Sequence, residues 1–433
     1  VGLRAVNVAS GEILLDIHGD TLLIPASTLK LITSAAALQR LSPHYRFRTS
    51  FLSVALPEQG EVRGDLFLKG YGDPVLVLEE IWLMARALRT QGIRSIRGDL
   101  VGDDSYFDAE RRGPAWADPL SQRAFNAKIG ALSVNFNRVT ILARPGVKPG
   151  HSVEVLIEPP SPYLILRNMG VTARQGQGRG LSVNRLEGDA GDTLVIEGSL
   201  AVGTPPQVMD RNISNPPLFA GMVMRELLAR EGIRVMGRVR VGLAPPEARE
   251  LHVHRSRALY RVIDDLHKFS NNLIAEQVLK TLGAEVQGPP GSREKGIAVL
   301  GDVLAEFGIL RGTYTLADGS GMSRFNRVSP AQLVTVLMRM AQDFRVQPEY
   351  LASLRSPDAE GRASSRFGHA AFEGRARVKT GTLDDVSALA GYVEPAAGGL
   401  VAFATLLNGP FCSMERAWQA QNAVVEQLIA LTR

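Results

Sequence analysis

The alternation of apolar and polar positions changes character along the 433-residue chain. Residues 2–8 and 11–17 read as two short strands joined by a turn, and a helix with a buried apolar stripe follows them. From about residue 49, short apolar runs alternate with Gly-Asp turns, which is typical of β structure, and only 79–92 looks helical. After about residue 218 long helical patterns return.

The pattern predicts the later elements as follows. The middle part contains four strand-like segments, at 133–144, 152–158, 181–186 and 193–199. Four helices are expected after it, at 218–232, 260–282, 293–308 and 330–343. The strand-like runs VSALAGYV and GLVAFATLL then lead into a helix at about 413–432. Strands at both ends with helices between them predict one α/β domain built from both ends of the chain, with the β-rich middle as an insertion.

Length and composition support this division. The chain is 45% hydrophobic and 21% charged, the profile of a globular protein with a sizeable core, and its length predicts two or three domains. Its apolar runs stay short of the roughly 18–20 residues of a membrane span. The start at Val1 suggests a mature or trimmed chain whose targeting segment, if it had one, is not included.

Charge and cysteine content narrow the function classes. The net charge of +5 comes from scattered arginines rather than basic blocks, which suits an anionic environment such as a cell wall. Nucleic acid is a weak alternative because no basic stripe is interleaved with aromatic residues. The single cysteine, Cys412, excludes an intramolecular disulfide framework and a thiolate metal site. With no H-E-x-x-H spacing either, we expect no metal and no cofactor.

The first candidate for chemistry is the stretch PASTLKLITSAAAL, which places Ser27 and Lys30 three residues apart on one helix face. A lysine that is partly desolvated loses its proton more easily and can then accept the proton of a serine hydroxyl. Taken alone, S-x-x-K is also the pattern of a serine N-cap followed by an exposed lysine.

Two later motifs favour the catalytic interpretation of S-x-x-K over the capping one. Ser270-Asn271-Asn272 lies within a helical pattern, and Lys379-Thr380-Gly381 lies on a strand and is followed by Thr382. Each triplet is weak by itself. The order S-x-x-K, S-x-N, K-T-G is a far stronger signal, because it is the signature of penicillin-binding proteins and serine β-lactamases.

The chain as a whole resembles the class C low-molecular-mass penicillin-binding proteins, the D-alanyl-D-alanine carboxypeptidase/endopeptidase family. The resemblance runs from near residue 1 to past residue 405 and includes GDLFLKGYGDPVL, IRGDLVGDDSYFD, ALSVNFN and ADGSGMSRFN. Members of this family carry about two small domains between the first two motifs. Residues 31–269 leave room for them and are too many for a class A β-lactamase.

The resemblance implies an α/β (α+β) penicillin-binding/β-lactamase-like transpeptidase domain, with a mixed antiparallel sheet flanked by helices and a large β-rich insertion. We expect the catalytic domain at 1–48 and 250–433. The expected inserted domains are domain II at 49–72 and 160–249, and domain III at 73–159.

The resemblance also implies catalytic roles. Ser27 would attack the carbonyl of the penultimate D-alanine and form an acyl-enzyme, with Lys30 as its general base. Ser270 would relay a proton to the leaving amine. Asn272 would bind a substrate amide carbonyl and fix Lys30.

The third motif would bind the substrate. Lys379 and Thr380 would receive its terminal carboxylate, and Gly381 would let the substrate backbone approach the strand. The backbone N–H groups of Ser27 and Thr382 would form the oxyanion hole.

Two further regions carry weaker expectations. In PAWADPLSQRAFNAKIGAL, Asp118 and Phe125 would meet the free amine of the peptidoglycan side chain, or else be a solvated loop aspartate and a packed phenylalanine. Asp318 and Ser320, in ADGSGMSR, are expected to shape the loop beneath the site.

The predicted function is an exported, periplasmic or otherwise extracytoplasmic, DD-peptidase. Its partners would be peptidoglycan stem peptides and β-lactams, with no nucleic acid and no transmembrane segment, and peripheral association with membrane or wall stays open. A serine β-lactamase is one alternative, although no deacylating base is identifiable. A non-catalytic wall-binding protein is another, although the intact motifs argue against it.

Overall fold

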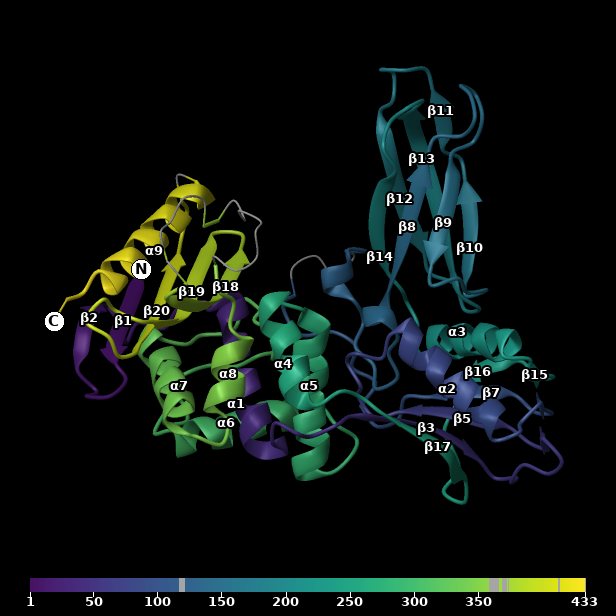
Figure 1. The fold of residues 1–433 in the computed structure, drawn as a ribbon, viewed down its shortest axis with the longest axis horizontal. Helices are drawn as coiled ribbons and strands as arrows, with labels where there is room; N and C mark the ends of the chain where they lie inside the picture. The colour runs from purple at the N-terminus through teal and green to yellow at the C-terminus, as the bar shows by residue number, and fades with distance from the viewer. Residues whose placement is uncertain (117–120, 358–365, 368–371, 373, 412, 433) are drawn as a thin grey trace. The chain divides into compact units, whose positions relative to one another are not determined.

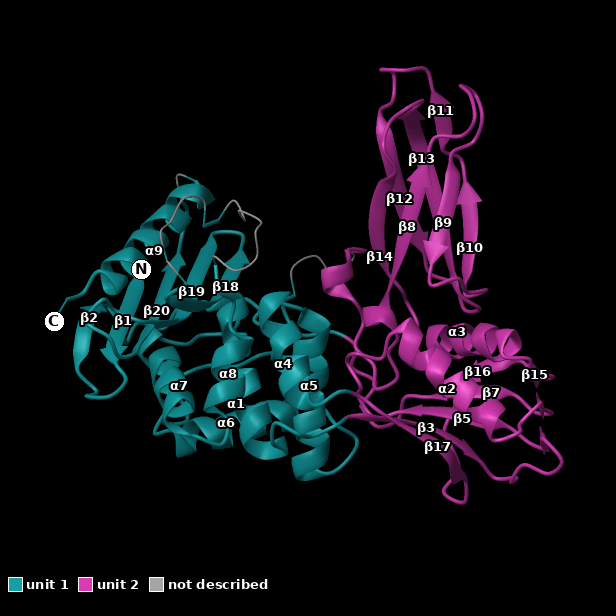
Figure 2. Ribbon diagram, viewed as in Figure 1, with its two compact units in different colours: residues 1–46, 112–117, 257–433 teal, residues 47–111, 118–256 magenta. Residues whose placement is uncertain are grey.

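The computed structural model describes residues 1–116, 121–357, 366–367, 372, 374–411 and 413–432. The chain forms two compact units (Figure 2). Unit 1 consists of residues 1–46, 112–117 and 257–433, and unit 2 of residues 47–111 and 118–256. Unit 2 begins at residue 47 and ends at residue 256, where the sequence predicts an insertion at 49–249, and the domain boundaries stay predictions.

Unit 1 is built around one antiparallel sheet to which both ends of the chain contribute (Figure 1). The strand order is β18-β19-β20-β1-β2. The strands span Ala376–Leu383, Val386–Val393, Val401–Asn408, Gly2–Asn7 and Ile13–Ile17. Strand β1 pairs along its length with β20, for example Leu3 with Thr405. The predicted α/β domain built from both chain ends is therefore confirmed.

Helices cover both faces of this sheet (Figure 1). Helix α9 (Met414–Ile429) packs on one face, where Val378, Phe403 and Val425 share a core. Helix α7 (Pro330–Gln342) packs on β19, β20 and β1. The remaining helices of unit 1 are η1 (Ala26–Leu29), α1 (Lys30–Leu41), α4 (Leu259–Lys268), α5 (Asn272–Gln287), α6 (Arg293–Glu306) and α8 (Gln347–Ser353). Helix α1 contacts α4, α5, α6 and α7, so its first turn is held from several sides.

The single helix expected over 260–282 is wrong, because the structure contains two helices there. Helix α4 ends at Lys268, and Ser270 has a φ of 53°, which interrupts the helical backbone. The Asn271 side chain then accepts a hydrogen bond from the N–H of Ile274 and caps α5. The apolar pattern of the sequence continues across this break and therefore gave no sign of it. The break is made by the left-handed backbone conformation of Ser270 and the Asn271 cap.

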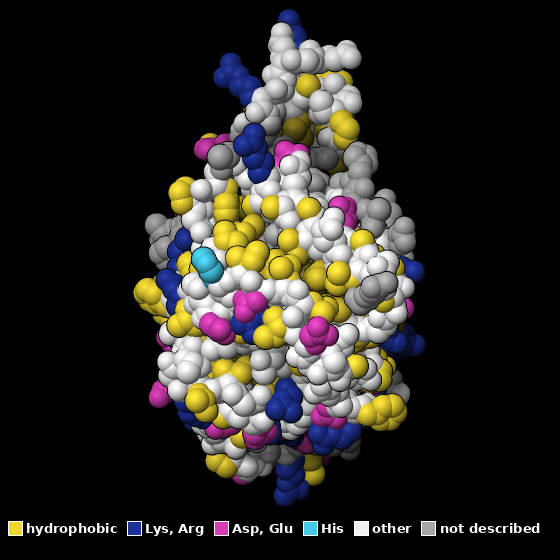
Figure 3. All heavy atoms as spheres, turned by 90° about the vertical axis from the view of Figure 1, so that its left-hand side faces the viewer, with side chains coloured by type: hydrophobic (Ala, Val, Ile, Leu, Met, Phe, Trp, Pro, Cys, Tyr) yellow, Lys and Arg dark blue, Asp and Glu magenta, His cyan; other side chains and the backbone are white. Residues whose placement is uncertain are grey.

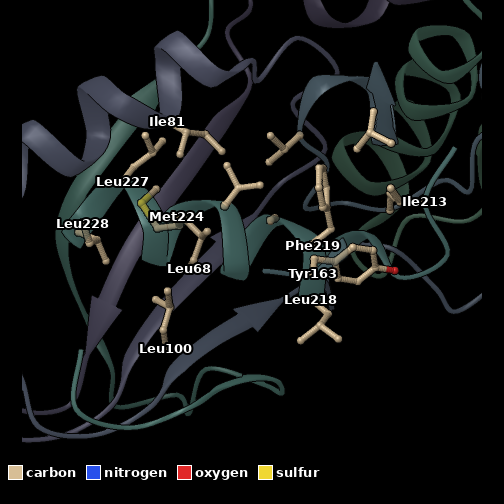
Figure 4. Close-up of a cluster of buried hydrophobic side chains, with 14 of the residues drawn as sticks. Leu68, Ile81, Leu100, Tyr163, Ile213, Leu218, Phe219, Met224, Leu227 and Leu228 are labelled. Atoms are coloured by element: carbon tan, nitrogen blue, oxygen red, sulfur yellow. The ribbon is translucent and has the colours of Figure 1, made fainter. Parts of the chain in front are cut away.

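Unit 2 contains an α/β part and a β part. In the α/β part the order β16-β7-β5-β3-β17 forms one sheet and β15-β6-β4 a smaller one, with helices α2 (Leu78–Thr90) and α3 (Pro216–Arg230). These strands are β3 (Arg48–Ser53), β4 (Glu61–Val62), β5 (Leu66–Gly70), β6 (Ser95–Ile96), β7 (Leu100–Asp103), β15 (Arg234–Val235), β16 (Val239–Val241) and β17 (Arg249–Arg255). Figure 4 shows its core, in which Leu68, Ile81 and Met224 are buried.

The β part has two small sheets, β14-β8-β9 and β10-β13-β11, and β12 pairs with β13. Its strands are β8 (Arg138–Arg144), β9 (Glu154–Glu158), β10 (Leu164–Asn168), β11 (Val171–Ala173), β12 (Gly180–Leu186), β13 (Asp192–Ala201) and β14 (Gln207–Asn212). Short 3₁₀ turns at Ala124–Asn126 (η2) and Asn135–Asn137 (η3) precede them.

Strand pairing groups the insertion differently from the expected boundaries. Strand β7, placed by expectation in 73–159, pairs with β5 of the other predicted domain, with Leu66 opposite Leu100. Strand β8 pairs with β14, although the sequence analysis assigned them to different domains. Such partners are set by long-range hydrogen bonds, which the local alternation of apolar runs and turns does not encode.

Two surface properties complete the description. No helix among the described residues is long and apolar enough to cross a membrane. On the face shown in Figure 3, basic and acidic side chains are interspersed and apolar ones gather near the middle.

Candidate active site

Ser27 lies on a tight turn that leads into a buried helix. It belongs to the 3₁₀ turn η1, and Lys30 is the first residue of α1. Ala26, just before the serine, has a φ of 46°. Ser27 is half-buried, whereas the Lys30 side chain is fully buried. The turn thus places a reachable hydroxyl directly above an enclosed amine.

Lys30 Nζ makes three hydrogen bonds to oxygen atoms. It lies 3.0 Å from Ser27 Oγ, 2.8 Å from Asn272 Oδ1 and 2.6 Å from the Ser320 carbonyl oxygen. Asn272 reaches it because α5 begins at this residue, immediately after the break at Ser270. Burial lowers the pKa of Lys30 to about 8, although the carboxylates of Asp318 and Glu276 act in the opposite direction.

A second buried lysine, Lys379 of β18, contacts the other serine. Its Nζ donates to Ser270 Oγ at 2.9 Å and to the Thr380 carbonyl at 2.7 Å. Burial lowers the pKa of Lys379 well below its usual range, and the positive charges of Lys30, Arg366 and Arg355 lower it further. Such a site favours an incoming anion, because a negative charge would offset this repulsion.

Strand β18 approaches the nucleophile turn at Gly381. A β-carbon at this position would lie 2.8 Å from the Ser27 nitrogen and 3.0 Å from the Pro25 carbonyl oxygen. Only glycine allows this approach. The close approach brings the backbone of β18 near Thr382 close to the backbone of Ser27. Thr382 itself is exposed. The three motifs therefore meet within unit 1 through Ser27, Lys30, Ser270, Asn272, Lys379 and Gly381.

The loop at 318–323 lies beneath this turn. The Asp318 carboxylate accepts hydrogen bonds from the N–H groups of Gly321 (2.8 Å) and Ser323 (2.7 Å). Gly321 has a φ of +81°, and a β-carbon there would lie 1.9 Å from the Ala26 carbonyl oxygen. Asp318 thus shapes the loop that supports Ser27.

Three buried residues near the site were missed by sequence reasoning. Glu276 accepts from the N–H groups of Gly319 and Ser320, and the Trp116 indole donates to Asp318 at 3.1 Å. His267 lies between Ser34 and Ser353, at 2.9 Å and 2.8 Å, and burial lowers its pKa to about 3. The spacing of Glu276, one turn after Asn272 in an apolar helix, was the available signal.

The structure does not test the two residues expected to recognise a side-chain amine. Asp118 lies outside the described residues. Phe125 lies on η2 of unit 2 and is 48% exposed. Both assignments stay predictions. Cys412 also lies outside the described residues.

Comparisons with known proteins identify the family of the chain. The D-Ala-D-Ala carboxypeptidase 3 (S13) family profile matches residues 1–431. The chain is 34% identical to a D-alanyl-D-alanine carboxypeptidase from Actinomadura sp. (strain R39), over 94% of this chain and 77% of the relative.

Solved structures of penicillin binding protein 4 (dacB) from Haemophilus influenzae are also similar. One has a TM-score of 0.85 at 26% identity and covers 99% of this chain and 96% of that chain. A second, complexed with a β-lactam, has a TM-score of 0.80 with the same identity and coverage. The predicted resemblance is confirmed, and the chain belongs to the D-Ala-D-Ala carboxypeptidase 3 (S13) family of serine peptidases.

Proposed function

We propose that Ser27 is the nucleophile and Lys30 its general base in a serine DD-peptidase that hydrolyses D-alanyl-D-alanine termini of peptidoglycan stem peptides. The observation that carries this proposal is the set of three contacts of Lys30 Nζ. The family membership supports the activity, and the geometry supports the assignment of residues.

The contacts of Lys30 favour a neutral amine aimed at the serine. The Ser320 carbonyl and Asn272 Oδ1 can only accept hydrogen bonds, so they take both N–H donors of a neutral amine. The lone pair is then left facing Ser27 Oγ, 3.0 Å away. Because burial lowers the pKa of Lys30 to about 8, the neutral form is accessible near neutral pH.

In the acylation step, Ser27 Oγ transfers its proton to Lys30 Nζ and attacks the carbonyl carbon of the penultimate D-alanine. Negative charge develops on the carbonyl oxygen, between the N–H groups of Ser27 and Thr382. The close approach at Gly381 supports this role of the two N–H groups. Collapse of the intermediate breaks the peptide bond, and the terminal D-alanine leaves.

Ser270 relays a proton to the leaving nitrogen and takes up in exchange the proton that Lys30 removed from Ser27, and Lys379 and Thr380 bind the terminal carboxylate. The hydrogen bond from Lys379 to Ser270 Oγ orients that hydroxyl. A bound carboxylate would raise the lowered pKa of Lys379 and keep it charged during turnover. The substrate therefore supplies the negative charge that this buried cation needs.

A peptidoglycan substrate and the D-Ala-D-Ala carboxypeptidase 3 (S13) family support an extracytoplasmic, periplasmic or cell-wall, location. Acylation by β-lactams is supported by the complex of the Haemophilus influenzae protein with a β-lactam.

Asp118 and Phe125 would recognise a free amine on the stem peptide. If so, Asp118→Asn would slow hydrolysis of peptides with that amine and leave their acetylated forms nearly unchanged. Equal losses on both would contradict this role.

Intact mass spectrometry after incubation with benzylpenicillin tests the nucleophile. We expect a one-to-one adduct that peptide mapping places on Ser27, and none with Ser27→Ala at an unchanged thermal midpoint. An adduct on the alanine variant would show that another residue is the nucleophile.

A further inference from the structure

The loop beneath Ser27 is held by two buried carboxylates. Glu276 Oε1 accepts from the N–H groups of Gly319 (3.0 Å) and Ser320 (2.8 Å). Asp318 binds the N–H groups of Gly321 and Ser323. Together they fix the peptide whose carbonyl oxygen contacts Lys30.

Helix α5 thereby controls two of the three partners of Lys30. Asn272, in its first turn, contacts Nζ directly. Glu276, one turn later and only 3% exposed, holds the N–H of Ser320, the residue whose carbonyl provides the second contact. The N–H of the peptide that carries this carbonyl, that of Gly321, is held by Asp318. A displacement of the Ser320 carbonyl would leave one N–H of the neutral amine without its acceptor.

Position 276 carries a carboxylate rather than an amide, although both can accept hydrogen bonds. A glutamine could accept the same two hydrogen bonds without burying a charge. Within the part of the chain that the structure describes, neither Glu276 nor Asp318 forms a salt bridge. Burial and the charge of Asp318 raise the pKa of Glu276. What a carboxylate adds over an amide is negative charge close to Lys30, which becomes an ammonium when it takes the serine proton.

We propose that Glu276 is a positioning residue for acylation, which holds the Ser320 carbonyl on Lys30 Nζ and stabilises the ammonium that Lys30 becomes. This inference rests on the proposed function of Lys30 as general base. The other ionisable groups that act on Lys30 or surround it are Asp318 on the loop, Lys379 on β18 and His267 on α4.

The experiment measures the second-order rate constant of acylation by a chromogenic β-lactam between pH 6 and 10. In Glu276→Ala we expect the plateau to fall at least about tenfold, because the Ser320 peptide is released. In Glu276→Gln the plateau should stay within about threefold of the parent, because the acceptor oxygen is kept. In both variants the acid limb should move to lower pH, because loss of an anion lowers the pKa of Lys30.

Glu285→Ala is the matched control, since Glu285 is an exposed glutamate on the same helix. It should leave rate and profile unchanged. A lower plateau with an unmoved acid limb would show a merely structural role and overturn the proposal, as would a Glu276→Ala enzyme of parental rate and profile. If Glu276→Ala does not fold, the acid limb of Glu276→Gln decides alone. Failure of the parent enzyme itself to acylate would contradict the proposed function instead.

Discussion

Lys379 Nζ lies 2.9 Å from Ser270 Oγ, and this hydrogen bond joins the outermost strand of the five-stranded sheet to the break between helices α4 and α5. Lys379 lies on β18, which contacts Ser27 through Gly381. Ser270 directly precedes α5, which contacts Lys30 through Asn272. The charge of Lys30 lowers the pKa of Lys379, so the charge of the second lysine depends on the protonation of the first.

Removal of the Lys379 side chain should lower kcat/KM more for peptides with a free C-terminal carboxylate than for the corresponding amides. A charge-assisted hydrogen bond is typically worth about 1.5–3 kcal/mol, which is roughly ten- to a hundredfold in kcat/KM. We therefore expect Lys379→Ala to lose this factor on peptides with a free carboxylate and far less on the corresponding amides. Steady-state kinetics on both series measures the difference, with Lys268→Ala as control, because Lys268 is a half-buried lysine paired with Asp264. Equal losses on acid and amide would refute the carboxylate-binding role.

The pH dependence of acylation should follow Lys30. Its pKa of about 8 in the free enzyme means that the reactive neutral form is scarce at low pH and dominant above pH 8. The second-order rate constant should rise about tenfold per pH unit below that value and then level off. At pH 6 it should be about a hundredth of the plateau. A flat profile from pH 6 to 9 would exclude Lys30 as the base.

Loss of Asn272 should impair the base without disturbing the fold. Asn272→Ala removes one of the two oxygen atoms that accept from the amine, so its lone pair is no longer held toward Ser27. We expect acylation to fall by at least about tenfold, the effect of losing one well-placed hydrogen bond to a group that becomes charged. The change of Asn271 to Ser, which keeps a helix cap at the preceding position, is the control.

Gly321 offers a paired test of close packing under the nucleophile. Gly321 and Gly11 have similar positive φ angles, +81° and +75°, but only Gly321 has backbone in the space of a β-carbon. Gly11→Ala should cost about 1–2 kcal/mol from backbone strain alone. Gly321→Ala should lower the thermal midpoint further and slow acylation, because the turn at Ala26 has to move. Equal effects of the two substitutions would show that the contact does not matter.

Sequence alone predicted the main features of the catalytic unit, because these are encoded locally. The strands at both chain ends and helices α6, α7 and α9 follow from apolar periodicity. The three motifs were recognised because S-x-x-K, S-x-N and K-T-G occur in this order along the chain. The break at Ser270 was not predicted, since a helix cap can sit inside a continuous apolar pattern.

The pairing of β8 with β14 was not predicted either, because register between distant strands leaves no local trace. The roles of Glu276 and Trp116 depend on contacts with the loop at 318–323, which the sequence does not reveal. Their partners are backbone groups and an aspartate far away in sequence.

The position of β1 between β20 and β2 has a consequence for the order of events during synthesis. Ser27 and Lys30 precede unit 2 in the chain, but the strand beside β1 is completed only at Asn408. The strand pairings of residues 47–256 are internal to that segment, so unit 2 can fold while the rest is still being made. The catalytic sheet has to wait for its last strands, since such distant contacts form late. A nascent chain would therefore carry its serine and lysine through the synthesis of unit 2 and of most of unit 1 without being able to react.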